Sequence, residues 1–206
     1  MMNITAVILA GGRARRMGGV DKGLQLFRGQ PLVWHCYQRL KDQVAQVAVN
    51  ANRNQERYAQ LGLPVFADEL ADFQGPLSGI LTGLKRSESD FVLFVPCDCP
   101  FLPLNLLEKL QQPILQSLQH HQSNSQSAGE NSSVLLTYAT DGEREHPTFC
   151  LVSTLLAEKL AAYLHSGERR MLQFMRENGA IAVDFRDQKE AFQNFNTLAD
   201  LESEMR

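Results

Sequence analysis

The chain has 206 residues, of which 44% are hydrophobic and 21% are charged, and its formal net charge at pH 7 is −3. This length is typical of a single domain with a substantial core, and the composition is that of a globular protein. The acidic balance argues against general binding to nucleic acid or to an anionic membrane. No apolar run approaches the roughly 20 residues of a membrane span, and the amino terminus lacks the features of a signal peptide. We therefore expect a cytoplasmic protein.

Apolar strands alternate with amphipathic helices along the chain, a pattern that predicts an α/β fold. We expect strands at residues 3–9, 46–50, 64–67, 91–95, 134–138, 147–152 and 180–185. We expect helices that begin at Pro31, Pro76 and Leu198 and others over residues 104–118, 154–165 and 171–177. The fold class is a three-layer, doubly wound, mostly parallel sheet with a small antiparallel excursion at 134–152. Pro113 should break or kink its helix, and the polar residues 119–132 should form a disordered surface loop.

The first strand leads into a loop that combines glycines with cations. Gly11, Gly12, Gly18 and Gly19 are accompanied by three arginines and Lys22. Glycines let backbone N–H groups approach a ligand closely, and the cations add full positive charge, so the loop suits a polyphosphate. Its spacing matches neither the Walker A motif nor the dinucleotide fingerprint. The alternative is that these glycines only form turns.

Polar or loop residues end several apolar runs. Leu9, Asn50, Asp68 and Asp98 each stand at the carboxyl end of an expected strand. Ligands of open α/β sheets bind outside that edge, which predicts one shared crevice. Taken alone, Asn50 and Asp68 could be turn residues, and Asp98 could cap the turn before Pro100.

The four cysteines include a Cys-x-Cys pair around Asp98, a spacing that differs from the Cys-x-x-Cys of zinc and redox sites. Without a secretion signal, we expect all four to be reduced and mostly packed in the interior.

Several short motifs occur in a fixed order along the chain. They are Leu-Ala-Gly-Gly at 9–12, Arg-Met-Gly-Gly at 16–19, Asp-Lys-Gly at 21–23, Val-Asn-Ala-Asn-Arg at 49–53, Gly-Pro-Leu-Ser-Gly at 75–79, Pro-Cys-Asp at 96–98, Asp-Gly-Glu-Arg at 141–144, His-Pro-Thr at 146–148, Gly-Glu-Arg-Arg at 167–170 and Asn-Phe-Asn-Thr at 194–197. In these blocks the chain resembles the MobA-type nucleotidyltransferases, and among them the molybdenum cofactor guanylyltransferases. Only the segment near 117–133 has no counterpart in the family pattern.

The resemblance implies transfer of GMP from GTP to the terminal phosphate of Mo-molybdopterin, with Mg²⁺ as cofactor. It implies a nucleotide-binding part at about 1–110, an acceptor-binding part at about 133–206 and a single domain over 1–206. The implied catalytic residues are Lys22, Arg16 and Asp98, and Asp98 is the implied metal ligand. The implied nucleotide contacts are Leu9, Ala10, Gly11, Gly12, Lys22, Asn50, Asp68 and Asp98.

The implied acceptor contacts are Arg169, Arg170, Asn194 and Asn196. The two arginines could instead lie on a solvated helix, and His146 has structural and acceptor-site interpretations of equal standing. Transient contact with other cofactor-biosynthesis proteins or with receiving apo-enzymes is a further expectation.

Two alternatives of function stay open. A molybdopterin cytidylyltransferase, or another sugar- or polyol-phosphate nucleotidyltransferase, would share the amino-terminal loop. A non-catalytic carrier of nucleotide or pterin is the alternative from another class, and Asp98 argues against it because a carrier does not need a magnesium carboxylate.

Overall fold

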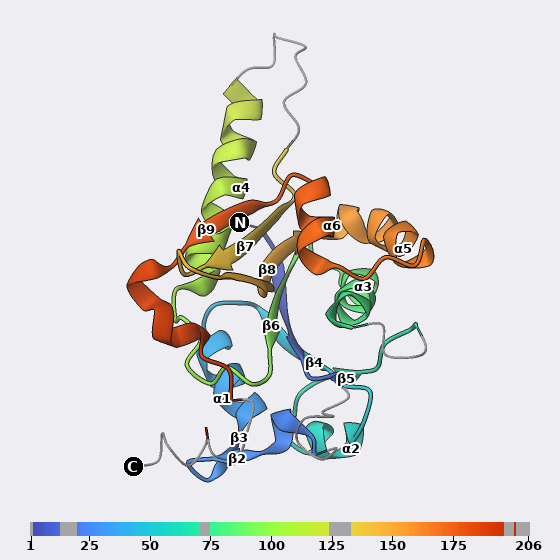
Figure 1. Ribbon diagram of the computed structural model, residues 1–206, viewed down its shortest axis with the longest axis vertical. Coiled ribbons are helices and arrows are strands. Elements are labelled where there is room, and N and C mark those ends of the chain that lie inside the picture. The colour runs from blue at the N-terminus through green and yellow to red at the C-terminus, as the bar shows by residue number, and fades with distance from the viewer. Residues whose placement is uncertain (1, 13–19, 71–74, 124–132, 196–199, 201–206) are drawn as a thin grey trace.

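The computed structural model describes residues 2–12, 20–70, 75–123, 133–195 and 200. In this part of the chain, a mixed sheet lies between two layers of helices (Figure 1). The strands of the large sheet follow the spatial order β5 (Val65–Phe66), β4 (Gln46–Asn50), β1 (Ile4–Leu9), β6 (Phe91–Pro96), β8 (Glu145–Ser153), β7 (Leu136–Thr140) and β9 (Ile181–Asp184). Among these strands β8 alone runs antiparallel to its neighbours.

The direction of winding reverses beside β1. From β1 the chain moves outward to β4 and β5 and then returns to place β6 on the other side of β1. The carboxyl ends of β1 and β6 therefore flank the switch point, where open α/β sheets bind their ligands. The prediction of a doubly wound, mostly parallel sheet with an antiparallel excursion is confirmed.

Helices cover both faces of the sheet. One face carries α3 (Pro76–Arg86), α5 (Ala157–His165) and α6 (Met171–Glu177), and the other carries α1 (Leu32–Leu40) and α4 (Leu106–Ser123) (Figure 1). Each layer has its own apolar core. Because β6 is covered on both faces, Phe91 to Val95 are all buried. The short α2 (Gln55–Ala59) adds Tyr58 to the core under α1.

The segment after Asp98 departs from expectation. The α4 helix continues past Pro113 as far as Ser123, so the prediction of a break was wrong and residues 119–123 are helical. Burial explains this outcome, because Leu106, Leu110 and Ile114 pack into one core from both sides of the proline. That packing outweighs one lost backbone hydrogen bond. The rest of the expected loop, 124–132, lies outside the described residues.

Short elements were not expected from the sequence. A hairpin joins β2 (Leu26–Phe27) to β3 (Gln30–Pro31), and Arg28 and Gly29 in its turn have φ angles of 50° and 80°. Positive φ at both central residues is the geometry that closes a two-residue hairpin. The 3₁₀ segments are η2 (Lys22–Leu24), η3 (Thr154–Leu156) and η4 (Arg186–Phe192). The helix expected from Leu198 lies outside the described residues except at position 200. None of the described helices could cross a membrane.

Candidate functional site

The carboxyl ends of three strands meet at one edge of the sheet. Leu9 pairs with Asn50 on one side and with Pro96 on the other. Beyond the strands, the Ala10 N–H donates to the Asn50 carbonyl at 2.8 Å and the Cys97 N–H donates to the Leu9 carbonyl at 3.2 Å. These bonds extend the ladder past the strand ends and place the first glycine turn beside the segment that carries Asp98.

A polar cluster closes one side of this edge. The Asn50 amide donates to Asp68 Oδ1 at 2.8 Å, and the Asn52 amide donates to Asp68 Oδ2 at 3.0 Å. The Asp68 N–H returns a bond to Asn52 Oδ1 at 2.8 Å. Both carboxylate oxygens of Asp68 therefore have amide partners, and Asn50 is itself buried. The cluster joins the ends of β4 and β5 and fixes the orientation of the Asn50 side chain.

Two glycines let the backbone approach this cluster. A Cβ on Gly79, in the first turns of α3, would lie 2.4 Å from Asn50 Oδ1, and one on Gly11 would lie 2.9 Å from Asn52 Nδ2. Real Cβ atoms do not approach so closely, so Asn50 would have to move if Gly79 gained a side chain. The Asn52 amide also bonds to the Gly11 carbonyl at 3.3 Å, and the Arg53 guanidinium bonds to the Gly12 carbonyl at 3.2 Å.

A lysine and a carboxylate face each other across the crevice. Lys22 Nζ lies 3.1 Å from Asp98 Oδ2, although the two residues are 76 positions apart. The side chains are 24% and 12% exposed, so the pair is largely shielded but still open to solvent on one side. The pair places one fixed cation and one carboxylate at the β1–β6 switch point.

The Lys22 backbone is held by the residue before it. Asp21 is buried and accepts hydrogen bonds from the Tyr58 hydroxyl and, at 3.0 Å, from the Asn54 amide. Burial raises the pKa of Tyr58, so the phenol stays protonated and donates a hydrogen bond to Asp21. Gly23 is required here because a Cβ would lie 2.5 Å from the Tyr58 oxygen. Asp21 and Lys22 are adjacent in sequence, but Asp21 contacts Tyr58 and Asn54 whereas Lys22 contacts Asp98.

Three of the four cysteines, Cys36, Cys97 and Cys99, lie in or against the turn that carries Asp98, which we call the Asp98 turn (residues 96–99). All four cysteines are free and buried. Cys36 Sγ on α1 lies 3.6, 3.6 and 3.4 Å from the carbonyl oxygens of Pro96, Cys97 and Cys99. Burial raises the pKa of Cys36 to about 12, so this thiol stays protonated as a packed donor beneath the turn.

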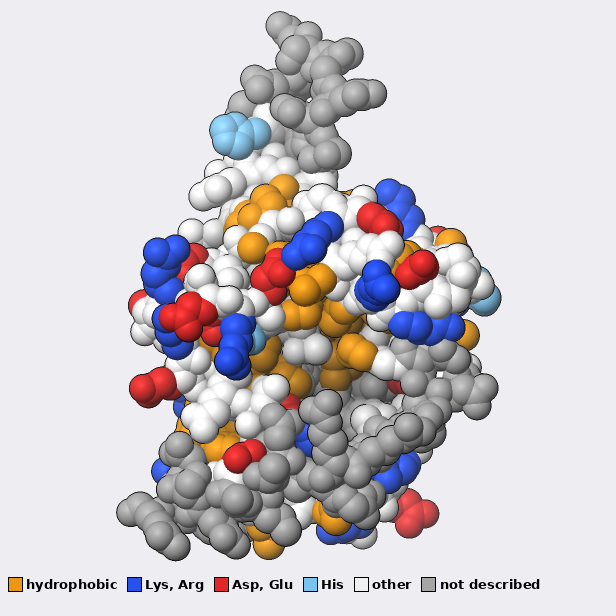
Figure 2. All heavy atoms as spheres, viewed as in Figure 1, with side chains coloured by type: hydrophobic (Ala, Val, Ile, Leu, Met, Phe, Trp, Pro, Cys, Tyr) orange, Lys and Arg blue, Asp and Glu red, His pale blue; other side chains and the backbone are white. Residues whose placement is uncertain are grey.

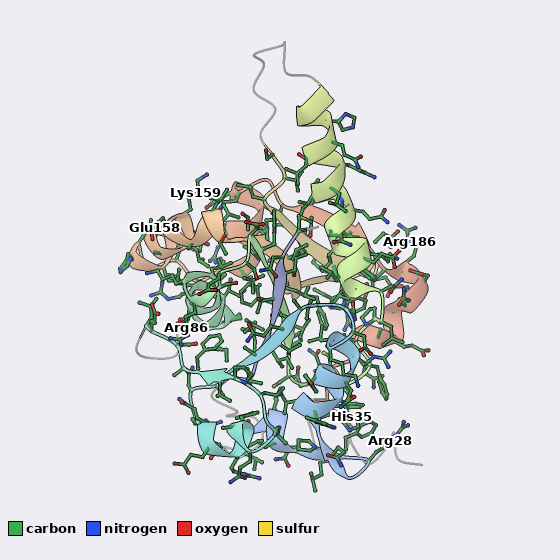
Figure 3. All side chains as sticks on the ribbon, turned by 180° about the vertical axis from the view of Figure 1, so that it is seen from behind. Arg28, His35, Arg86, Glu158, Lys159 and Arg186 are labelled. Atoms are coloured by element: carbon green, nitrogen blue, oxygen red, sulfur yellow. The ribbon has the colours of Figure 1, made fainter. Side chains whose placement is uncertain are left out.

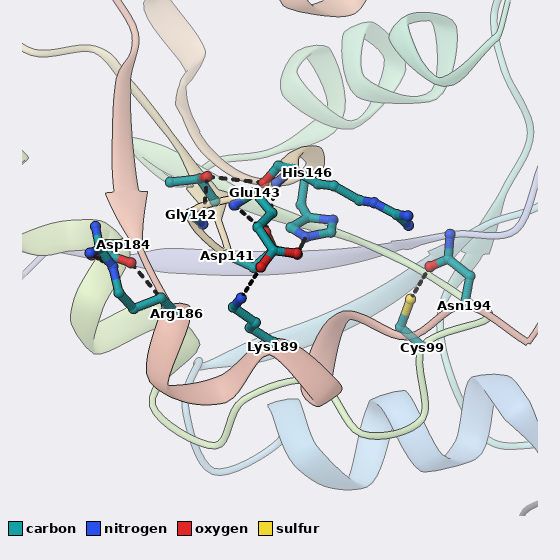
Figure 4. Close-up of polar contacts among 11 residues, drawn as sticks. Cys99, Asp141, Gly142, Glu143, His146, Asp184, Arg186, Lys189 and Asn194 are labelled. Carbon is teal, nitrogen blue, oxygen red and sulfur yellow. Dashed lines mark hydrogen bonds and ion pairs between the residues drawn. The ribbon is translucent and has the colours of Figure 1, made fainter.

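The far end of the same edge carries a second polar cluster, at the turn between β7 and β8. Asp141 accepts from the N–H groups of Glu143 and Arg144 at 2.8 and 2.6 Å and contacts His146 Nε2 at 2.8 Å (Figure 4). The Arg144 N–H, with the His146 ring, holds the pKa of Asp141 well below its usual range. The His146 ring stacks on Phe192 with 4.6 Å between centroids. These contacts favour a structural role for His146.

The two arginines expected at the acceptor have different surroundings. Arg169 donates to the carbonyls of Leu164 and Glu168 at 2.7 and 2.6 Å, where α5 ends. Arg170 instead lines a shallow groove of about 610 Å³ between Pro147 and α6. Figure 2 shows this face of the molecule, with charged side chains of both signs over η4 and α6 and hydrophobic side chains between them.

Of the paired asparagines, Asn194 reaches the Asp98 turn. Its side-chain oxygen accepts a hydrogen bond from the Cys99 thiol (Figure 4). The N–H of Phe195 donates to the Asp98 carbonyl at 2.9 Å. Asn196 and Arg16 lie outside the described residues. The structure thus brings one acceptor candidate next to the residue expected to bind metal.

A carboxylate and a lysine lie beside a glycine turn at the switch point of a doubly wound sheet, which is where open α/β sheets bind their ligands. Residues 6–181 match the MobA-like NTP transferase domain, and the chain belongs to that family. It is therefore a nucleotidyltransferase, and the family resemblance found in the sequence is confirmed.

Relatives match almost the whole chain. A Pasteurella multocida protein named molybdenum cofactor guanylyltransferase is 63% identical over 202 residues, which cover 98% of this chain and 99% of the relative. A Haemophilus influenzae protein of the same name is 56% identical over 200 residues, covering 97% and 96%.

Solved structures share the fold at low identity. Molybdopterin-guanine dinucleotide biosynthesis protein A from Archaeoglobus fulgidus superposes with a TM-score of 0.69 at 16% identity and covers 97% of this chain and 95% of its own. 4-Diphosphocytidyl-2C-methyl-D-erythritol synthase from Anaerococcus prevotii gives 0.68 at 12%, covering 98% and 94%. The fold is thus common to enzymes that are named for different nucleotides.

Residue-by-residue inspection of the sequence missed several parts of the site. Asn52 belongs to the Val-Asn-Ala-Asn-Arg block, yet no role was assigned to it, although it bridges Gly11 and Asp68. Tyr58 and Phe195 carry no polar signature of a site, and only the fold shows that they hold Asp21 and the Asp98 backbone.

Proposed function

We propose that this protein transfers GMP from GTP to the terminal phosphate of Mo-molybdopterin, forming molybdopterin guanine dinucleotide and pyrophosphate. The observation that carries the proposal is the Lys22–Asp98 pair at the β1–β6 switch point, next to the Asn50–Asp68 cluster. The activity named for relatives at 56–63% identity over nearly the full chain supports it.

Asp98 is the residue that would hold Mg²⁺. Its carboxylate offers hard oxygen ligands, is largely shielded, and faces the cation that would otherwise neutralise it. Mg²⁺ takes one or two protein carboxylates and completes its shell with water and phosphate oxygens, so a single Asp is a suitable donor. When bound, the metal would supply charge neutralisation at the phosphates of GTP. Once Asp98 had a metal partner, Lys22 would become available to a phosphate.

The remaining groups bind and orient the triphosphate. The Gly11 carbonyl is turned toward Asn52, and in a trans peptide the following N–H points the opposite way, which leaves the Gly12 N–H directed away from the cluster. Together with Leu9 and Ala10, this turn would line the phosphates. Lys22 and Arg16 would neutralise the leaving pyrophosphate. The oriented Asn50 and Asp68 side chains would contact the nucleoside.

No general base is required for this reaction. The acceptor's phosphate monoester has its second pKa near 6 and is already anionic at neutral pH. The obstacle is repulsion between an anionic nucleophile and an anionic triphosphate, so catalysis consists mainly of positioning and charge neutralisation. The task of the chain's residues is to hold the two substrates in line.

The acceptor would lie on the carboxyl-terminal part of the same edge. Arg170 on its groove suits a phosphate, whereas Asn194 and Asn196 offer paired donors and acceptors to a pterin ring. Arg169 is a weaker candidate because it bonds to the end of α5. We also place the reaction in the cytoplasm and expect transient contact with receiving apo-enzymes or other cofactor-biosynthesis proteins.

The test is pyrophosphate release from GTP, CTP, ATP and UTP, each with purified molybdopterin and Mg²⁺. We expect release with GTP in preference to the other three. Preference for CTP would make the protein a cytidylyltransferase of the same fold, an outcome that the low-identity fold matches allow. Tight binding of GTP or pterin without pyrophosphate release would identify a carrier and would contradict the proposal.

A further inference from the structure

The carboxyl-terminal segment returns to the centre of the sheet edge after η4. There the Phe195 N–H donates to the Asp98 carbonyl at 2.9 Å, and Asn194 accepts from the Cys99 thiol. Both contacts join residues about a hundred positions apart. They connect the backbone of the expected metal ligand to the segment that carries the expected pterin contacts.

The Phe195 ring occupies a small aromatic core of its own. It is 1% exposed and lies 5.2 Å from the Phe27 ring and 5.8 Å from the Phe101 ring, measured between centroids. Phe27 and Phe101 themselves meet edge to face at 5.7 Å. Leu32 completes this cluster, which is separate from the two main cores.

Each ring of this cluster belongs to a different functional segment. Phe27 lies in β2, directly after the η2 turn that carries Lys22, and Phe101 follows the Asp98 turn by two residues. The Phe27 carbonyl contacts His35 Nε2 at 2.8 Å, and Arg28 covers the Phe27 ring at 4.9 Å. Figure 3 shows Arg28 and His35 side by side at this end of the molecule. Phe195 therefore packs against Phe27, in the hairpin that follows Lys22, and against Phe101, which follows the Asp98 turn.

We infer that Phe195 is a positioning residue that sets the acceptor segment in register with Asp98 and Lys22. The inference rests on the proposed function and adds a residue to it. In-line transfer needs the attacking phosphate and the α-phosphorus held within a narrow range of separations, and a misplacement of about 1 Å can cost about a hundredfold in rate. Phe195 controls that separation through its ring and its backbone N–H, without touching either substrate.

The test compares Phe195→Leu with Phe91→Leu. Phe91 is also buried, but it lies at the opposite end of β6 from Asp98, so it controls for the loss of a buried ring. With Phe195→Leu we expect kcat for pyrophosphate release to fall about tenfold or more, with the Kd for GTP changed less than about threefold. Phe91→Leu should change neither value beyond about threefold. Equal kcat losses in the two variants would overturn the inference.

A second readout needs no substrate. Hydrogen exchange of the amides at 97–102 and 24–27 should accelerate in Phe195→Leu and not in Phe91→Leu, since only the first change loosens the packing between these segments. Unchanged exchange at 97–102 would overturn the inference even if the proposed activity holds. Accelerated exchange in a protein inactive with GTP and molybdopterin would instead contradict the proposed function alone.

Cys99→Ala keeps the Phe195 ring in place and removes the thiol contact to Asn194. It provides a test if Phe195→Leu does not fold. We expect KM for the acceptor to rise about threefold or more while the Kd for GTP stays unchanged, with partial recovery in Cys99→Ser, whose hydroxyl can donate to the same amide oxygen. An effect on GTP binding without an effect on the acceptor would overturn the inference.

Discussion

The two halves of the sheet edge hold their polar side chains in different ways. At the ends of β1, β4 and β6 the groups are shielded and bond across the chain, as in Asn50–Asp68 and Lys22–Asp98. At the ends of β7 and β9 the Asp141–His146 cluster is shielded, but the neighbouring charged groups form exposed ion pairs, such as Arg186–Asp184. Exposed pairs contribute little free energy, so they hold their side chains only weakly in one geometry. The first half is thus preorganised for a ligand, whereas the second is free to adapt to one.

This comparison predicts where substitutions cost most. Asp98→Asn should leave the fold intact and lower turnover about a hundredfold or more, because it removes the charge that would hold Mg²⁺ while it keeps the size of the side chain. Pyrophosphate release at saturating Mg²⁺ measures the effect. Asp187→Asn is the matched control, since Asp187 forms an exposed ion pair with Lys109. Activity of Asp98→Asn within a few-fold of wild type would remove Asp98 from the metal site.

The next effect separates the two substrates. Lys22→Ala should weaken GTP binding, whereas Asn194→Ala combined with Asn196→Ala should spare GTP and weaken pterin binding. Each lost hydrogen bond to a neutral ring should cost about 0.5–1.5 kcal/mol. Added salt should shrink the lysine effect and leave the asparagine effect unchanged, because salt screens only charges. Titration of both ligands against both variants at two salt concentrations checks this. Loss of GTP binding in the asparagine variant would mean that the acceptor site lies elsewhere.

The elements of the fold were predictable where hydrophobic periodicity is strong. The strand at 46–50 and the helix at 171–177 have their expected bounds, and Asp98 follows the most buried strand as its position indicated. Packing decided the exceptions. Pro113 by itself predicts a helix break, but Leu110 and Ile114, which flank it, are both buried and hold the helix against the core. Periodicity reports the local preference and not the tertiary contacts that override it.

The sequence predicted which strand ends form the site, but not which side chains pair with one another there. Parallel strands bring their carboxyl ends to one edge, which places Leu9, Asn50 and Asp98 together. Which side chains bond there depends on contacts between distant segments. Lys22 stands next to Asp21 in sequence, yet it pairs with Asp98, because Tyr58 and Asn54 already bind Asp21.

The acceptor half should respond to pH through Asp141. Its lowered pKa means that Asp141 stabilises the fold at pH above its unfolded value, about 4, and that this contribution disappears as the pH falls toward the lower folded value. Asp141→Asn should therefore reduce the free energy of unfolding at pH 7 by about 1–3 kcal/mol, since it weakens bonds to two N–H groups and to His146.

Urea unfolding at pH 7 and at pH 3 measures this difference. The gap between wild type and Asp141→Asn should narrow at the lower pH, because there the carboxylate of the unfolded chain binds a proton while the folded carboxylate, whose pKa is lowered, stays ionised. Asp184→Asn, which changes an exposed pair on the same edge, is the control and should show a smaller gap at pH 7. A gap that widens on acidification would contradict the assigned direction of the pKa shift.

The smallest effect is expected farthest from the edge. The composition of residues 124–132 predicts a solvated connection, so its replacement by a short glycine-serine turn should leave turnover within about twofold, with a loop-closure change of only about 0.6 kcal/mol per halving of length. A longer deletion, 119–132, also removes the last turn of α4 and should destabilise the protein more, because the shortened chain would pull on the bond between Val134 and Ser117, which are 3.1 Å apart. Urea unfolding and pyrophosphate release on both deletions measure the difference. If the shorter deletion abolished pterin binding, residues 124–132 would belong to the acceptor site, and the adaptable half of the edge would extend beyond β7 and β9.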